Sequence, residues 1–179
     1  MKINTIDKLA PYLLEDTTET TPHNSYYSYF PPEYIKFIET YNGKIGFNHG
    51  AILNSPQHIP QTNGIIRVDY LYGASSGLYG LNYNIESAFN IMPSRDYLAF
   101  GECPGGDKVC LNKNSGHVYF FWHDAPTDDE CFYLLSNDIF EFMNTITQED
   151  KVIIENKKNV KITLSPRLQK IINQSKNNT

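Results

Sequence analysis

The sequence lacks the features of a membrane or exported protein. None of its 179 residues lies in an apolar run that approaches the roughly 18 residues of a membrane span. The N-terminal segment MKINTIDKLAPYLLEDTTE carries acidic residues early and has no long apolar stretch of the kind that a signal peptide needs. The sequence therefore predicts a protein that is made and kept in the cytoplasm and does not contact a membrane.

Cysteine is scarce, which argues against a disulfide framework. The three cysteines, Cys103, Cys110 and Cys131, are an odd set without a C-x-x-C pair. Cys103, Cys110 and His117 are spaced seven residues apart and could meet on adjacent strands, but a buried thiol beside a hydrogen-bonded histidine is the commoner arrangement. The histidines form no H-E-x-x-H motif. We therefore expect reduced, mostly buried thiols, no metal and no cofactor.

A hydrolase motif occurs once, without its usual surroundings. Gly73-Ala74-Ser75-Ser76-Gly77 matches the G-x-S-x-G nucleophile elbow, in which the serine lies between a strand and a helix that follows directly. Here Gly80 follows within a few residues and helical periodicity begins only at Ile85. The chain is also short for an α/β-hydrolase. We therefore expect a loop of small residues at Ser75 and no catalytic residues.

Charge is divided unevenly along the chain, whose net charge is −5. Residues 1–150 contain 8 lysines and arginines against 19 aspartates and glutamates, a balance of −11. Residues 151–179 contain 7 basic residues and one acidic residue, a balance of +6. An acidic body repels nucleic acid and attracts basic proteins, although many acidic surfaces serve only solubility. This balance predicts no direct contact with nucleic acid.

The spacing of apolar residues and turn signals predicts helices and strands in an α+β order. Helices are expected after Asn4 or Thr5, from Phe30-Pro31-Pro32-Glu33 to a stop at Asn42-Gly43, over Ile85–Met92 with Asn84 as N-cap, and after Ser136 as N-cap. Strands are expected at Ile45–Phe47, Ala51–Leu53, Ile65–Tyr72, Tyr97–Cys103, Val109–Leu111, His117–His123 and Cys131–Leu135. In the tail, a hairpin over residues 152–164 and a short basic helix from Ser165 are expected.

Two of the expected helices carry apolar stripes at positions i, i+3, i+4 and i+7, which predicts that these side chains face the core. The stripes are Ile85, Ala88, Phe89 and Met92 in one helix, and Ile139, Phe142, Met143 and Ile146 in the other. Truncating Phe89 or Phe142 to alanine is therefore expected to destabilise the protein strongly.

Four separated pieces of the sequence carry a family resemblance. They are residues 30–43 with the proline-led helix and its Asn-Gly end, Leu71-Tyr72-Gly73 with the helix that follows, the strands of residues 97–124 with the Gly105-Gly106-Asp107 turn, and the helix beginning Ser136-Asn137-Asp138. In this order and spacing they resemble the SUKH superfamily, in its Smi/Knr branch, over about residues 30–147. The polar N-terminal loop and the basic tail depart from the family pattern.

The resemblance implies a single α+β domain with a mixed or mostly antiparallel sheet and flanking helices, plus a C-terminal extension. We divide the chain into an N-terminal helix and polar loop (1–29), a SUKH-like core (30–147) and a basic C-terminal extension (148–179). Bacterial members are typically immunity proteins that bind and silence a cognate toxin domain, frequently a nuclease. Some fungal relatives instead regulate cell-wall synthesis as interaction hubs.

An immunity protein whose partner is a cognate protein toxin is therefore the expected function. A non-enzymatic regulatory or scaffold module on the same fold is the alternative. Neither role needs catalytic residues or a cofactor. The sequence leaves the oligomeric state and the identity of the toxin open, because a fold alone does not fix its partner.

The expected partner-binding site is an acidic loop next to an aromatic strand. A rigid acidic loop can imitate a phosphate backbone and dock on the basic cleft of a nuclease, and a tryptophan beside it can serve as an anchor. The alternative is a solvated loop that binds nothing. The candidate residues are Asp107, Trp122, Asp124, Asp128, Asp129 and Glu130, with Pro126 limiting the flexibility of the loop.

Overall fold

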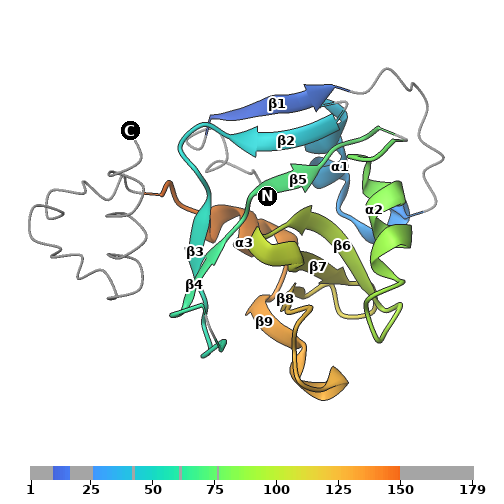
Figure 1. Cartoon of the computed structure of the whole chain (residues 1–179). Helices are drawn as coiled ribbons and strands as arrows, with labels where there is room; N and C mark the ends of the chain where they lie inside the picture. Colours follow the sequence, from blue (N-terminus) through green and yellow to red (C-terminus); the bar gives the residue numbers. More distant parts are fainter. Residues whose placement is uncertain (1–9, 17–25, 42, 61, 76, 150–179) are drawn as a thin grey trace, which may run out of the picture.

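The computed structural model describes residues 10–16, 26–41, 43–60, 62–75 and 77–149 (Figure 1). One sheet contains seven strands in the spatial order β1 (Pro11–Asp16), β2 (Gly43–Phe47), β5 (Tyr70–Tyr72), β6 (Tyr97–Glu102), β7 (Lys108–Asn112), β8 (Val118–Phe121) and β9 (Phe132–Ser136). A second sheet pairs β3 (Ile52–Asn54) with β4 (Ile65–Arg67). The helices are α1 (Pro32–Glu39), α2 (Leu81–Ala88) and α3 (Ile139–Thr145). All of these strand pairs are antiparallel, so the predicted α+β class is confirmed.

Helix α1 begins where the sequence places its prolines. Pro31 is the N-cap, Pro32 opens the first turn, and Glu33 complements the positive end of the helix dipole there. The helix ends at Thr40 in a right-handed conformation, and Gly43 is already the first residue of β2. The predicted helix is confirmed, but its predicted left-handed glycine stop is wrong, because Gly43 is extended to pair with β1.

Residues 65–72, predicted as one strand, form two strands in different sheets. β4 pairs with β3, whereas β5 pairs with β2 and β6. Between them, the Val68 N–H donates to the carbonyl of Ala51 and the Asp69 N–H donates to the carbonyl of Glu102. The single-strand prediction is wrong because the backbone changes partners at Val68 and Asp69. Burial alternates only from Ile65 to Asp69, and the consecutive residues Leu71 and Tyr72 are both buried.

Helix α2 starts four residues before the predicted position. Its N-cap is Gly80, and Asn84 lies inside the first turn. The Asn84 amide donates to the carbonyl oxygens of Leu78 and Gly80, at 2.7 and 2.9 Å. Asn84 therefore stabilises the start of the helix from within it and is not the cap. Of the predicted stripe, Phe89 is only half-buried; the buried members are Ile85, Ala88 and Met92.

Helix α3 is capped by Asp138, two residues after the predicted cap. The Asp138 carboxylate accepts the Glu141 N–H at 2.7 Å, and the Glu141 carboxylate accepts the Asn137 N–H at 2.7 Å. This exchange satisfies backbone donors at the start of the helix. Ser136 is instead the last residue of β9, which explains why the predicted cap is wrong. The predicted stripe is confirmed, since Ile139, Phe142, Met143 and Ile146 are all buried.

The two ends of the chain are described only in part. The helix predicted near the N-terminus begins in residues 1–9, outside the described residues, and the next stretch, Pro11–Asp16, is strand β1. A proline is tolerated at the first position of such an edge strand, because no central ladder bond is lost. The hairpin and helix predicted for residues 152–172 lie outside the described residues.

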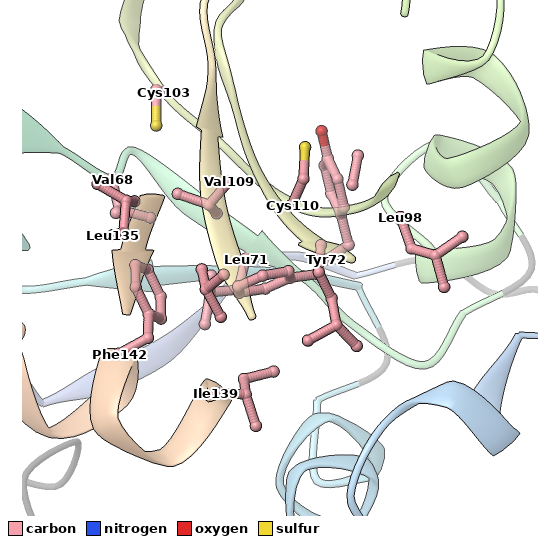
Figure 2. Close-up of a cluster of buried hydrophobic side chains, with 14 of the residues drawn as sticks. Val68, Leu71, Tyr72, Leu98, Cys103, Val109, Cys110, Leu135, Ile139 and Phe142 are labelled. Atoms are coloured by element: carbon pink, nitrogen blue, oxygen red, sulfur yellow. The ribbon is translucent and has the colours of Figure 1, made fainter. Parts of the chain in front are cut away.

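The core lies between the large sheet and the helices α1 and α3. Phe100 of β6 makes edge-to-face contacts with Tyr34 of α1 and Phe142 of α3, at ring-centroid distances of 5.7 and 5.5 Å. Figure 2 shows Ile139 and Phe142 pointing from α3 toward Leu71 of β5. All five side chains are at most 1% exposed. The helices therefore cover one face of the central strands.

Tyrosines in or against this core, of which Tyr34 and Tyr72 are buried and Tyr27 is partly buried, are expected to make its stability fall at alkaline pH. Burial raises the pKa of Tyr27 to about 12 and the pKa values of Tyr34 and Tyr72 well above their usual range. The Tyr72 hydroxyl also donates to the Glu102 carboxylate, which disfavours the phenolate further. The unfolded chain releases these protons near pH 10, whereas the folded protein retains them.

We expect the free energy of unfolding contributed by these tyrosines to be fully present below pH 10. It should decline as the pH rises from 10 toward 12, because the unfolded state then binds fewer protons than the folded state. Urea unfolding between pH 8 and 11.5 measures this decline. Tyr72→Phe, which removes one of the ionisable hydroxyls, should show a smaller decline. A wild-type stability that stays constant across this range would contradict the expectation.

Candidate functional site

The hairpin of β8 and β9 carries the predicted acidic loop and projects from one end of the sheet (Figure 1). The Trp122 N–H donates to the Cys131 carbonyl at 2.8 Å, which extends the ladder one step beyond the strands. The Cys131 thiol donates to the Asp128 carbonyl at 2.9 Å, and the Glu130 N–H donates to the Thr127 carbonyl at 3.1 Å. These bonds tie the loop to the sheet at its base and fold its tip into a 3-10 turn.

The acidic side chains of this loop face solvent. Asp128, Asp129 and Glu130 form the 3-10 turn, and all three are exposed. The side chain of Asp124 is 76% exposed. Within the described part of the chain, no lysine or arginine forms an ion pair with these four residues. Their negative charge is therefore presented outward from a hairpin that is anchored at its base.

Asp107 has a different environment from the other predicted acids. Only 17% of its side chain is exposed, and its Oδ1 atom accepts the backbone N–H of His123 at 3.0 Å. The Nδ1 atom of His123 lies 2.8 Å from the same oxygen, and since a carboxylate only accepts, Nδ1 carries the proton. The Nε2 atom of His123 lies 3.2 Å from Asp124. Asp107 therefore connects the turn after β6 to the acidic loop.

His123 is the site residue that the sequence reasoning did not select. The register of β7 and β8 could have revealed it, because Lys108 pairs with Phe121. Extending this register by one residue at each end places Asp107 opposite Trp122, next to His123. The turn expected at residues 113–116 fixes that register, so the proximity was implicit in the sequence.

The aromatic residues of this strand are divided between core and surface. Phe121 is buried, while Tyr119 and Trp122 are half-buried. The Trp122 ring packs against the core cluster, so only part of its surface is open to a partner. Trp122 therefore supports the base of the acidic loop and has limited area for direct contact.

Ser75 and the three cysteines, the residue types that could act as nucleophiles or metal ligands, are buried. Ser75 lies in the loop before α2 and is 1% exposed, so an ester substrate could not reach it in this conformation. The three cysteines are free and buried, as predicted, and burial raises the pKa values of the Cys103 and Cys110 thiols well above their ordinary value. Among the described residues, no group of three or more His, Cys, Asp or Glu side chains is placed to hold a metal ion. The absence of catalysis stays a prediction.

Among the described residues, no helix is both long enough and apolar enough to cross a bilayer.

Comparisons with known proteins identify the family. The model of the SMI1/KNR4 family (SUKH-1) matches residues 28–145, a range that runs from before α1 to the end of α3 and includes the acidic loop. Over 78 residues the chain is 24% identical to the SPbeta prophage-derived uncharacterized protein YokK of Bacillus subtilis (strain 168). That alignment covers 44% of this chain and 40% of the relative, so the chain matches less than half of the relative's length. No solved structure matches the chain.

The family match covers both the helices of the fold and the candidate site. SUKH proteins are known for immunity functions and are typically not catalytic. The matched range is about two thirds of the 179 residues and contains all three described helices. The chain belongs to the SMI1/KNR4 family (SUKH-1).

Proposed function

We propose that this chain is an immunity protein that binds and neutralises a cognate toxin domain in the cytoplasm, without catalysing a reaction. The observation that carries the proposal is the acidic loop, which exposes four carboxylates on a hairpin tied to the sheet by backbone bonds. Membership of a family known for immunity proteins supports the same function.

Charge indicates the kind of toxin that fits. Residues 1–150 carry a balance of −11, and the exposed loop concentrates part of that charge at one end of the sheet. A toxin that acts on nucleic acid needs a basic surface to bind its substrate. Opposite potentials raise the rate of association, and dissolved salt reduces this gain. A nuclease whose basic cleft is covered by this loop is therefore the partner we propose.

The six candidate residues divide into three roles in this proposal. Asp128, Asp129 and Glu130 steer and contact the partner, together with the exposed Asp124. Asp107 contributes through His123, because its bonds to that residue hold the loop in position. Trp122 closes the base of the loop through its backbone N–H.

The test replaces Asp128 and Asp129 with asparagine and Glu130 with glutamine in one variant. At low salt, the variant should associate at least about tenfold more slowly than wild type with its cognate toxin domain, because the steering charge is lost. Its association rate should also depend less on ionic strength. Stopped-flow or surface-based kinetics at several salt concentrations measure both effects.

A matched control removes the same charge elsewhere. Glu33, Glu39 and Glu86 are exposed on α1 and α2, and replacing all three with glutamine should change the association rate much less. Equal effects of the two variants would mean that total charge matters and the loop does not. A wild-type chain that fails to protect cells from toxins encoded beside its gene, or that has no such neighbour, would contradict the immunity function and favour the regulatory module.

A further inference from the structure

A cavity of about 250 Å³ lies between the β3–β4 hairpin and the turn that follows β6. Pockets for small ligands and cofactors commonly have volumes of about 300–1,000 Å³, so this one has room for a single long side chain. It adjoins the acidic loop, because Asp107, which lines it, is bonded to His123. Its lining includes Ile65, Ile66 and Arg67 of β4, Pro104 and Asp107 of the turn, and Phe120 of β8.

The inner wall of the cavity is apolar. Ile66, Cys103 and Phe120 line it and are at most 3% exposed. The Cys103 thiol is neutral, because burial raises its pKa well above the ordinary value. Ile65 also lines the cavity and is 49% exposed, so an aliphatic surface continues from the wall to the solvent. A long aliphatic stem would therefore find apolar contact along its whole length.

The two charged residues that line the cavity, Arg67 and Asp107, differ in the contacts that they already form. Arg67 forms an ion pair with Glu149, so its charge already has a partner. Asp107 uses only Oδ1 for both of its contacts with His123. Among the described residues, no group is hydrogen-bonded to its Oδ2 atom. The cavity therefore combines an apolar wall with a lining carboxylate, Asp107, that can accept a further bond at its second oxygen.

We propose that this cavity receives one arginine side chain of the toxin, and this inference rests on the function proposed above. The aliphatic stem packs against Ile65 and Ile66, and the guanidinium donates to Oδ2 of Asp107. Arginine is enriched among the residues that dominate binding energy at protein interfaces. The acidic loop then sets the rate of association, and the occupied cavity slows dissociation.

The chemistry of the cavity can be tested without the toxin, by titrating the full chain with arginine ethyl ester. Methyl NMR should show saturable shifts at Ile65 and Ile66 at millimolar concentrations. Citrulline ethyl ester, which has the same shape but a neutral end, should bind at least tenfold more weakly. Equal binding of the two esters, or no shift at either residue, would overturn the proposal. Preferential binding of glutarate would do so as well, since it would assign the cavity to an acidic group held by Arg67.

The toxin's use of the cavity is tested by Ile65→Lys, which places a positive charge at the opening. The variant should lose the arginine ester and dissociate from the toxin at least tenfold faster than wild type. Ile91→Lys is the matched control, because Ile91 is 54% exposed and does not line the cavity; it should behave as wild type. Thermal melting of both variants checks that the fold is intact.

Failure of this inference differs from failure of the proposed function. If wild type and Ile65→Lys protect cells equally and dissociate from the toxin at the same rate, the cavity is not the anchor, while the immunity function stands. If the wild type does not protect, the immunity function is wrong, and the inference that depends on it is overturned.

Discussion

Replacing Phe142 with alanine is expected to lower the free energy of unfolding by about 3–5 kcal/mol. The side chain is completely buried between α3 and the sheet, and its ring lies edge-to-face against Phe100 at 5.5 Å. Phe100 contacts Phe30 and Tyr34 in turn, so these neighbours hold one another in place and cannot easily collapse into the space left by the ring. Urea unfolding of wild type and variant measures the loss.

Phe89→Ala is the informative comparison for Phe142→Ala. The sequence pattern assigned both rings to the core, but Phe89 is only half-buried, against Tyr26 at 6.1 Å and the Arg95 guanidinium at 5.3 Å. Its removal is expected to cost at most about 2 kcal/mol, since less apolar surface is withdrawn from water. If both variants lost the same stability, the half-buried position of Phe89 at the end of α2 would be wrong.

Gly80→Ala is expected to be destabilising by about 3 kcal/mol, at the upper end of the range for overpacked sites. A Cβ atom at this position would lie 1.8 Å from the carbonyl oxygen of Ser75. The backbone cannot move aside freely, because the Gly80 N–H donates to Gly77 and the Leu81 N–H donates to Gly73. The φ angle of Gly80 is −82°, which any residue can adopt, so the cost comes from space and not from backbone conformation.

The control for Gly80→Ala is Ser87→Ala, which changes an exposed position of the same helix. Its stability should stay within about 0.5 kcal/mol of wild type. Thermal or urea unfolding of the two variants separates the contact with Ser75 from a general effect on α2. A Gly80→Ala protein as stable as the control would contradict the close approach of the loop to the helix.

Local periodicity predicted those parts of the fold that depend on neighbouring residues. The stripe of α3 was found because residues three and four apart share one face of a helix, and that geometry needs no distant partner. The division at Val68 and Asp69 was missed because it is set by hydrogen bonds to Ala51 and Glu102, each at least 17 residues away in the sequence. The start of α2 at Leu81 was missed because it depends on the loop before it, which is closed by the hydrogen bond from the Leu81 N–H to the Gly73 carbonyl and which helical periodicity does not reveal.

The residues of the candidate site were also predictable only where the signal is local in the sequence. The acids of the loop were identifiable because Asp128, Asp129 and Glu130 are contiguous. The bond between Asp107 and His123 spans 16 residues and depends on the pairing of β7 with β8. The cavity was not predictable from local patterns, because β4, the turn after β6 and β8 each supply part of its wall.

The bond between Trp122 and Cys131 has an evolutionary consequence. Residues 123–130 lie beyond it, and all are exposed except the half-buried Ala125. Apart from His123 and Ala125, which packs against the core, changes at these positions should alter stability by no more than about 0.5 kcal/mol. Descendants of this protein could therefore exchange the tip of the hairpin for one of another charge or shape while the sheet stays as it is. If the hairpin is the interface proposed above, its specificity for a partner can change faster than the sheet that carries it.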